Sequence, residues 1–375
     1  MITVQIHEVL AFYIVFRYVL SCVYIFLMFL RVVSKGDIMD RSKIGSGRDE
    51  NRVPLYKIVP LNVPFSIGIG TSDFCNFKCK YCAQSTSIGI TPQILTWDKF
   101  VDIISQIEEM LENNGAKCIK NFQICGIGEP LICKEVPEMI HYVKERGISD
   151  RIELTTNGSL LTHELSKKLI DAGLTRLLIS VQGINKEAYK KICDYDIDFE
   201  KFIDEIAYFY QNRQQCSVYI KIADVALKEG EDKLFYDIFS PVADMVNIEH
   251  IMDGFTIVDY TNMIEKHRKK TRYGYDWQER ICCDSLFMRM NIASNGDVNA
   301  CGCQWPGLSI GNINKKSLTQ IWNGEAHKKY MELHLSGNRS MIVKCRDCES
   351  ISFAGHPMDD LDDHLDEILK RVNKL

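Results

Sequence analysis

Three cysteines in the first quarter of the chain have the spacing of a metal site. Cys75, Cys79 and Cys82 are separated by three and two residues, and the aromatic Tyr81 directly precedes the last of them. Three thiolates can bind three irons of a four-iron cluster and leave the fourth iron open to a cofactor or substrate. The alternatives are a zinc knuckle or three unrelated buried thiols. Zinc usually takes a fourth protein ligand at knuckle spacing, and no further Cys or His follows within twenty residues.

A short glycine-containing segment further along could hold an organic ligand through its backbone. Residues 125–130 read Cys-Gly-Ile-Gly-Glu-Pro. Glycines let a ligand approach the main chain closely, and exposed carbonyls can accept hydrogen bonds from an ammonium group. An ordinary turn would use the same residue types.

The cysteine spacing, with its aromatic residue, resembles that of the radical S-adenosylmethionine (SAM) superfamily. The resemblance implies a [4Fe-4S] cluster bound by the three cysteines, with SAM chelating the open iron. It also implies that Tyr81 contacts this cofactor and that the glycine segment binds the SAM amino group, although Ile127 stands where relatives usually have a glycine. The residues of that segment that would contact SAM are Gly126, Gly128, Glu129 and Pro130.

Polar residues at the ends of two later strands resemble positions that contact SAM or substrate in this superfamily. These are Asn157 and Ser180; the alternatives are a turn residue with positive φ and a small strand residue with a locally satisfied hydroxyl. Relatives often carry an arginine for the SAM carboxylate about a dozen residues beyond the serine. Here Lys190 and Lys191 occupy that stretch, so the contact is either moved to a lysine or lost.

Residues 281–350 contain six cysteines and resemble the twitch, or single-cluster SPASM, domain of radical SAM enzymes. The resemblance implies that four of them saturate an auxiliary [4Fe-4S] cluster suited to electron transfer: Cys283, Cys301, Cys345 and Cys348. Cys282 and Cys303 are alternative ligands one or two residues away, and otherwise small buried hydrophobes. A zinc site built from the same four thiols is the main rival.

Apolar periodicity between these cysteine groups alternates between the strand and the helix pattern. Strands are expected at residues 65–69, 122–125, 151–156, 176–181, 218–225 and 245–251. Helices are expected at residues 97–111, after 137, at 162–173, 186–212 and 232–239. Because such units form parallel sheets with right-handed crossovers, the sequence predicts an α/β fold: a partial (β/α)6 TIM-like barrel with a small cysteine-rich C-terminal domain.

The chain divides by composition into six parts. They are an apolar segment (1–38), a lead-in (39–62), the barrel (63–251), a connector (252–280), the SPASM/twitch domain (281–350) and a C-terminal helix (351–375). Residues 9–30 are apolar enough to span a bilayer, and the basic residues that follow would keep the catalytic part in the cytoplasm. A non-native extension with the true start at Met39 is the alternative.

Charge and cysteine content exclude some classes of protein. The net charge is −5, so a nucleic-acid partner is not expected. Membrane contact is expected only through residues 9–30. Fifteen cysteines without the spacing of a disulfide scaffold fit metal binding in a reducing cytoplasm.

The sequence therefore predicts a radical SAM enzyme that abstracts hydrogen from a small polar substrate such as a sugar or cyclitol, with the auxiliary cluster taking an electron. A separate electron donor such as flavodoxin or ferredoxin is expected. A small molecule is preferred over a ribosomally made peptide because few residues precede the first strand; peptide maturation stays an alternative, as does a non-catalytic iron–sulfur or zinc-binding protein. Catalytic candidates at the ends of strands five and six are Lys221, Glu249 and His250, each of which could also be a solvated or paired strand end.

Overall fold

The structure is a computed structural model that describes residues 41–45, 51–85, 91–251, 258–261, 263, 270–301 and 307–374. The chain separates into two compact units, Met1–Ser42 and Lys43–Leu375, and the elements below belong to the second. The apolar stretch 9–30 and Met39 lie outside the described residues. Every helix in the described part of the chain is too short or too polar to cross a bilayer.

Six parallel strands form the main sheet and confirm the predicted barrel order. They are β1 (Ser66–Gly70), β2 (Asn121–Cys125), β3 (Ile152–Thr156), β4 (Arg176–Val181), β5 (Ser217–Ala223) and β6 (Met245–Glu249). Each strand pairs in parallel with the next one along the chain. Because the strands are parallel, all six carboxyl ends meet at one edge, which is where α/β barrels carry their chemistry.

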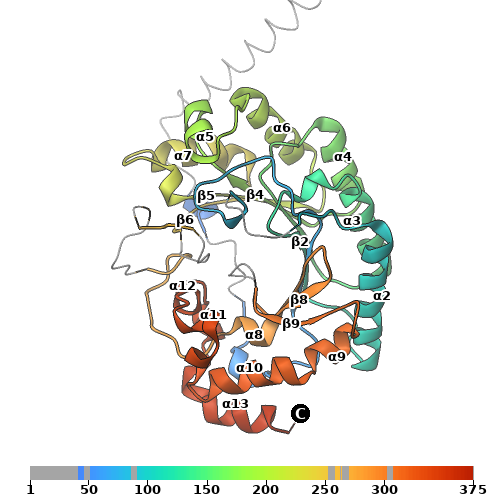
Figure 1. The fold of residues 1–375 in the computed structure, drawn as a ribbon. Coiled ribbons are helices and arrows are strands. Elements are labelled where there is room, and N and C mark those ends of the chain that lie inside the picture. The colour runs from blue at the N-terminus through green and yellow to red at the C-terminus, as the bar shows by residue number, and fades with distance from the viewer. Residues whose placement is uncertain are drawn as a thin grey trace, which may run out of the picture. The chain divides into compact units, whose positions relative to one another are not determined.

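Helices connect these strands and cover the outer face of the sheet (Figure 1). They are α2 (Trp97–Asn113), α3 (Val136–Arg146), α4 (His163–Asp171), α5 (Lys186–Cys193), α6 (Phe199–Asn212) and α7 (Asp232–Phe239). The start of α2 follows the sequence prediction, because the Thr96 hydroxyl accepts a hydrogen bond from the backbone N–H of Lys99. Gly115, with φ of 59°, follows the end of that helix.

The prediction of one helical pattern over residues 186–212 is wrong in its middle. Asp194 has φ of 50° and ends α5, and Asp198 caps the start of α6 by accepting from the N–H of Lys201. The apolar spacing continues across this break, so periodicity alone does not reveal it. The break matters for the site, because it places the end of α5 beside the cysteine loop.

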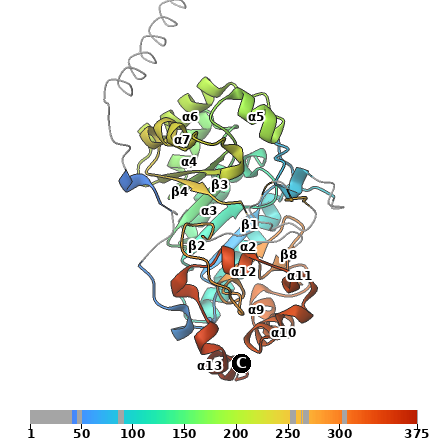
Figure 2. The ribbon, with the colours of Figure 1, turned by 90° about the vertical axis from the view of Figure 1, so that its left-hand side faces the viewer.

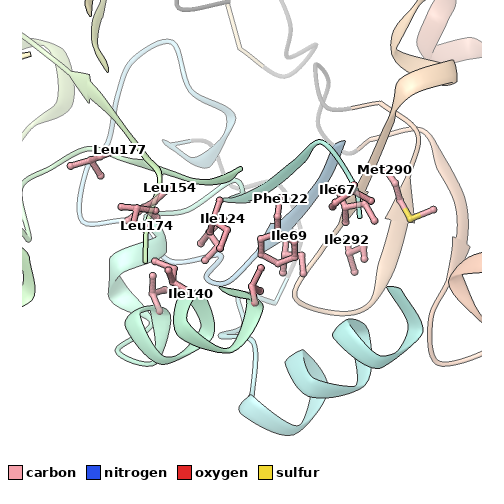
Figure 3. Close-up of a cluster of buried hydrophobic side chains, with 14 of the residues drawn as sticks. Ile67, Ile69, Phe122, Ile124, Ile140, Leu154, Leu174, Leu177, Met290 and Ile292 are labelled. Carbon is pink, nitrogen blue, oxygen red and sulfur yellow. The ribbon is translucent and has the colours of Figure 1, made fainter. Parts of the chain in front are cut away.

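The core lies between the sheet and its helices. Successive side chains of a strand point to opposite faces, so alternate residues of β1 to β4 are buried on the helix side (Figure 3). The side chains drawn there include Ile67, Ile69, Phe122, Ile124, Leu154 and Leu177, with Ile140 of α3 against them. The intervening positions of these strands face the other side and include Gln123, Glu153 and Arg176, which are polar.

The C-terminal cysteine-rich region continues the same sheet, which the sequence did not predict. β7 (Arg289–Ile292) pairs in parallel with β1, and β8 (Asp297–Asn299) and β9 (Ser309–Asn312) follow as antiparallel strands. The resulting nine-stranded order is β6-β5-β4-β3-β2-β1-β7-β8-β9. The two cysteine groups are therefore joined through adjacent strands.

The remaining helices belong to the C-terminal region. They are α8 (Ser285–Met288), α9 (Leu318–Trp322), α10 (Glu325–Leu335), α11 (Val343–Arg346), α12 (Ser350–Phe353) and α13 (Leu365–Val372). Helices α9 and α10 contact β9, and α13 packs against α10 in the lower part of Figure 2. Within the C-terminal part 351–375, the amphipathic pattern predicts a helix from about Leu361 to Val372, and the structure has α13 there, preceded by a 3₁₀ turn at Asp362–His364. Gly355 and Pro357 follow α12, and short 3₁₀ turns fill the stretch up to α13.

Candidate active site and auxiliary metal centre

The cysteine loop leaves the carboxyl end of β1 and is fixed at its middle by α5. The backbone N–H of Lys78 donates to the carbonyl of Cys193 at 2.9 Å, and that of Lys80 donates to the carbonyl of Ile192 at 3.0 Å. The last carbonyls of a helix have no partner within the helix. The loop satisfies two of these carbonyls, and this anchors the segment that carries the three thiols.

The three thiols of this loop are partly buried, and their charges raise one another's pKa. Burial raises the pKa of Cys75 to about 11 and also raises that of Cys82. The pKa of Cys79 lies far above its usual range. The largest cause is a hydrogen bond with Cys193, the second is burial, and the charges of Cys82 and Cys75 add to the effect. Thiols in this environment hold their protons until a metal centre replaces them. The donor set therefore fits an iron–sulfur cluster.

The glycine segment after β2 packs against the backbone of the cysteine loop. A Cβ atom on Gly128 would lie 2.3 Å from the carbonyl oxygen of Phe74 and 2.4 Å from that of Ser72. The N–H of Glu129 donates to the same Phe74 carbonyl at 2.8 Å. The space left by the missing side chain of Gly128 is therefore occupied by the backbone of the cysteine loop.

The carboxylate of Glu129 ties the ends of β2 and β3 together. Its two oxygens accept from the Thr156 hydroxyl at 2.6 Å and from the backbone N–H groups of Leu131 and Asn157 at 3.0 and 2.7 Å. Burial raises the pKa of this carboxyl despite those bonds. Because the side chain is engaged inside the protein, any contact of the segment with a ligand's ammonium group falls to backbone carbonyls.

Asn157 connects the end of β3 to the cysteine loop. Its side-chain amide donates to the side-chain oxygen Oδ1 of Asn76 at 2.9 Å, and the Asn76 amide in turn donates to the Ser159 hydroxyl at 2.8 Å. Positive φ occurs at the following residue, Gly158, so Asn157 does not have the turn conformation that was the alternative. A hydrogen bond between the buried Asn157 side chain and Cys75 also partly offsets the effect of burial, which raises the pKa of that thiol.

Tyr81 connects the loop to the end of β4. Its hydroxyl donates to the side-chain carbonyl of Gln182, and the amide of Gln182 donates to the backbone carbonyl of Ser180 at 2.9 Å. The Tyr260 hydroxyl donates to the Tyr81 carbonyl at 3.0 Å. The structure therefore brings together Tyr81 and Ser180, both predicted site residues, through Gln182.

Lys190 has a different environment. Its ammonium group pairs with Asp194 at 2.7 Å, and both side chains are more than half exposed. The structure thus gives Lys190 a surface partner and does not bring it to the three thiols.

Two of the weak catalytic candidates form a buried ion cluster at the ends of β5 and β6. The carboxylate of Glu249 accepts from Lys221 at 3.0 Å and from Arg272 at 2.6 Å, and the Tyr219 hydroxyl lies 3.4 Å away. Burial alone would raise the pKa of Glu249, but Arg272 and Lys221 outweigh it and lower this pKa to about 2. A carboxylate with so low a pKa is a poor proton acceptor at neutral pH and a good anchor for two cations.

His250, the third candidate, pairs with an aspartate from the neighbouring strand end. Its Nδ1 lies 2.9 Å from Asp224, and nearly half of the side chain is exposed. The other Asp224 oxygen accepts from the N–H groups of Val225 and Ile251 at 2.9 and 3.0 Å. Because the carboxylate is held by two backbone groups, it can orient the imidazole, as in other His–Asp pairs that accept protons.

The four cysteines predicted for the auxiliary centre surround one cavity. It is lined by Cys283, Leu286, Cys301, Leu308, His334, Arg339, Lys344, Cys345, Cys348 and Ile351. Cys282, one alternative ligand, is buried apart from this lining, and its N–H donates to Asp362. Cys303, the other alternative, lies outside the described residues. No three His, Cys, Asp or Glu side chains of the described residues are close enough to hold a single metal ion.

Three basic side chains line the same cavity. Burial, and then the charge of Arg339, lowers the pKa of His334 to about 4. Burial likewise lowers the pKa of Lys344 and raises that of Cys345 to about 11. Thiols beside cationic groups are the environment in which an anionic iron–thiolate centre is stabilised, so the donor set fits a cluster here as well.

Sequence reasoning missed three residues that the structure brings to these sites. Gln182 directly follows β4, as Asn157 follows β3, so its place at a strand end was a usable signal. Arg272 lies in the connector, where the sequence has no periodic pattern. His334 lies on the buried face of the short helix α10. Neither of these two had a signal in the sequence.

Comparison with known families identifies both cysteine regions. The family description "Radical SAM superfamily" matches residues 69–222, and "Iron-sulfur cluster-binding domain" of the SPASM type matches residues 282–349. A probable GTP 3′,8-cyclase of Methanocaldococcus jannaschii is 36% identical over 141 residues, which cover 38% of this chain and 44% of that protein. A GTP 3′,8-cyclase of Aliarcobacter butzleri is 32% identical over 44% of this chain and 47% of that protein. The chain thus matches less than half the length of these relatives.

Solved structures share the fold at low sequence identity. BtrN in complex with AdoMet and 2-DOIA has a TM-score of 0.54 and 16% identity, covering 78% of this chain and 96% of BtrN. The anSMEcpe protein with bound AdoMet also has a TM-score of 0.54, with 14% identity over 83% of this chain and 96% of that protein. The two family matches, together with the paired cysteine sites, lead to one assignment. The chain belongs to the radical SAM superfamily and carries a C-terminal SPASM iron–sulfur domain.

Proposed function

We propose that Cys75, Cys79 and Cys82 hold the cluster at which this enzyme cleaves SAM, and that the enzyme then takes a hydrogen atom from a small polar substrate such as a sugar or cyclitol. The observation that carries this proposal is the attachment of the three-thiol loop to the carboxyl ends of β2, β3 and β4. When bound, the cluster supplies the electron that splits SAM into methionine and a 5′-deoxyadenosyl radical.

The residues around the loop have positioning roles in this proposal. Gly126 to Pro130 offer backbone carbonyls to the SAM amino group, while Gly128 keeps the loop close. Asn157 and Tyr81 hold the loop against β3 and β4. The protein's contribution is to fix the reacting atoms in place and to exclude water, which is how proteins support cofactor chemistry.

The ion cluster of Lys221, Glu249 and Arg272 supports a polar substrate. The cluster lies at the ends of β5 and β6, at the same sheet edge as the cysteine loop, because all six strands are parallel. It brings the charged side chains of Lys221, Arg272 and Glu249 together. A hydroxyl-rich or anionic compound can hydrogen-bond to such a group, whereas an apolar compound would leave it desolvated without compensation.

The His250–Asp224 pair is the proton acceptor in this proposal. Oxidation of a C–H bond next to a hydroxyl releases one hydrogen atom, one electron and one proton. Bound SAM would supply the acceptor for the hydrogen atom, and His250 takes the proton. Cys283, Cys301, Cys345 and Cys348 would hold the auxiliary cluster, which would supply the acceptor for the electron. A flavodoxin or ferredoxin would supply the first electron.

The names of similar proteins point to two other substrates. The matched cyclases are named for GTP, and anSMEcpe has been solved with a Cp18Cys peptide. The cyclases are matched over less than half their length, and the likeness to anSMEcpe is one of fold. We therefore treat GTP and a ribosomally made peptide as competing outcomes of the substrate test.

The test of SAM cleavage is anaerobic reconstitution with iron, sulfide and SAM, followed by dithionite. We expect 5′-deoxyadenosine and methionine from the wild type, and none from Cys79→Ala. Cys118→Ala is the matched control, because that thiol lies outside both sites beside Asp150 and should leave the yield unchanged. Purified protein containing zinc without iron and sulfide, or no 5′-deoxyadenosine from the wild type, would contradict the proposal.

The substrate test follows the fate of deuterium. Deuterated sugars and cyclitols, GTP and a peptide mixture are supplied in separate reactions, and mass spectrometry measures deuterium in 5′-deoxyadenosine. We expect incorporation from a sugar or cyclitol. Deuterium transfer from GTP alone, or from a peptide alone, would contradict the proposed sugar or cyclitol substrate. It would not contradict the proposal that the enzyme cleaves SAM.

A further inference from the structure

His334 lies at the edge of the auxiliary cavity with its two ring nitrogens in different situations. The residue is in the last turn of α10 and is 1% exposed. Its Nδ1 is 3.2 Å from the backbone nitrogen of Cys283. Its Nε2 is buried and has no hydrogen-bonding partner among the described residues.

The backbone contact determines the tautomer. A peptide N–H can only donate, so Nδ1 of His334 must be the acceptor in the bond with Cys283 and cannot carry a hydrogen. A neutral imidazole without a hydrogen on Nδ1 carries it on Nε2. His334 therefore has an N–H group, out of water, on a side chain that lines the cavity of the four thiols.

A buried donor without a partner normally destabilises a protein, so such groups in a native fold usually have a ligand or another role. The polar atoms that a ligand would bring to this cavity are the sulfurs of an iron–sulfur cluster. Both thiolate and inorganic sulfide sulfurs accept hydrogen bonds. A donor to these sulfurs stabilises the more negative, reduced form of a cluster and so raises its reduction potential.

We propose that His334 donates a hydrogen bond from Nε2–H to a sulfur of the auxiliary cluster and thereby raises the reduction potential of that cluster. This inference rests on the assignment of Cys283, Cys301, Cys345 and Cys348 in the proposed function. It makes His334 a positioning and tuning residue for the electron acceptor, and not a ligand of iron.

Arg339 and Lys344 have other roles at the same cavity. Arg339 donates to the carbonyls of Cys345 and Cys348, and Lys344 donates to the carbonyl of Gly307 at 2.7 Å. These bonds fix the backbone around two of the thiols. His334 differs from both, because its Nδ1 accepts from the backbone of Cys283 while its Nε2 has no partner among the described residues and can donate to a cluster.

The experiment measures the midpoint potential of the auxiliary cluster by EPR-monitored titration. The full chain carries Cys75→Ala, Cys79→Ala and Cys82→Ala, so that only the auxiliary cluster remains, and neither SAM nor substrate is added. In this background we expect His334→Leu to shift the potential to a more negative value with unchanged iron and sulfide. His334→Gln, whose amide can accept from Cys283 and donate to sulfur, should restore most of the shift. The control is His327→Gln, a buried histidine of the same helix whose ring nitrogens contact the carbonyls of Trp322 and Leu286.

Three results would overturn the inference. An unchanged potential in His334→Leu would exclude the hydrogen bond, and loss of iron and sulfide in both His334 variants would make the residue a ligand. Should His334→Leu fail to fold, the Nε2–H tautomer is checked in the wild-type background by NMR of ¹⁵N-histidine, and an Nδ1–H tautomer would contradict the proposal. Absence of any cluster from the triple variant would instead overturn the four-cysteine assignment itself, which is a failure of the proposed function.

Discussion

The carboxylate of Asp73 accepts a hydrogen bond of 2.5 Å from the hydroxyl of Ser294, a residue that follows it by 221 positions. Asp73 lies two residues before Cys75, and Ser294 follows β7. Asp73 also accepts from the N–H of Gln93 at 3.1 Å, and both members of the pair are buried. The contact thus links the start of the cysteine loop directly to the C-terminal region.

Removing this hydroxyl should destabilise the apoprotein. Ser294→Ala leaves a buried carboxylate oxygen with one donor fewer, and hydrogen bonds to charged groups contribute about 1.5–3 kcal/mol. We expect the free energy of unfolding to fall by about 2 kcal/mol in urea denaturation. Ser105→Ala is the control, since that exposed hydroxyl bonds only to the carbonyl of Val101 in its own helix. Equal stability of the two variants would show that the Asp73–Ser294 contact contributes nothing.

Gly128→Ala should damage the first cluster site. The new Cβ would collide with the carbonyl oxygens of Ser72 and Phe74 at 2.4 and 2.3 Å, so the cysteine loop must move. Inserting an atom into a packed site and shifting its backbone costs about 1–3 kcal/mol. We expect loss of the iron held by the first cluster and of 5′-deoxyadenosine formation, measured by metal analysis and chromatography.

The matched control for that variant is Gly230→Ala. Gly230 has φ of 83°, and no atom lies within 4 Å of the position that a Cβ would take there. The substitution therefore carries the conformational cost of about 1–2 kcal/mol without a collision. Iron content should stay at the wild-type value. A Gly128→Ala protein with full iron content would mean that the loop tolerates displacement.

The Glu249 ion cluster predicts a defined pH dependence of stability. The pKa of Glu249 is lowered in the folded protein from 4.5 to about 2, because the charges of Arg272 and Lys221 outweigh the effect of burial. A lowered folded-state pKa gives stability that is fully present above pH 4.5 and is lost as the pH falls toward 2. Glu249→Gln should therefore lower the free energy of unfolding by about 3 kcal/mol at pH 7.

The difference between wild type and Glu249→Gln should narrow below pH 4.5, as measured by urea denaturation of the apoprotein at a series of pH values. Glu164→Gln serves as control, since Glu164 forms an exposed pair with Lys168 on α4. A gap between wild type and Glu249→Gln that is constant from pH 7 to pH 3 would refute the anchoring role.

His250→Gln should separate SAM cleavage from substrate oxidation. If His250 accepts the substrate proton, its loss should slow product formation by about 10²-fold, the usual contribution of a general base. Formation of 5′-deoxyadenosine should continue, because the cysteine loop is untouched. The ratio of product to 5′-deoxyadenosine is the measurement, and His141→Gln on the surface of α3 is the control. An unchanged ratio would remove His250 from the reaction.

Local patterns predicted the strands and most helix ends, because those depend on nearby residues. Thr96 and Gly115 mark the ends of α2 in the sequence as they do in the structure. The break at Asp194 was missed because the apolar spacing runs through it and neither glycine nor proline stands there. Parallel pairing of β1 with β7 joins residues more than 220 positions apart, and nothing in either strand's composition names its partner.

The candidate site shows the same division. The grouping of Cys75, Cys79 and Cys82 could be predicted from the sequence, because three thiols within eight residues necessarily lie close together in one loop. The Nε2–H group of His334 could not, because it depends on which nitrogen meets the backbone of Cys283. Such a contact exists only once α10 has packed against α8.

The parallel pairing of β1 with β7 has a mechanical consequence. Ser66 to Ile69 are in register with Arg289 to Ile292, so the strand that leads into one iron site is bonded edge to edge to the strand beside the other. The rate of electron tunnelling falls steeply with distance. Here the distance between the two sites depends on backbone hydrogen bonds between β1 and β7 and not on a flexible hinge. The two redox centres should therefore stay at one separation throughout turnover.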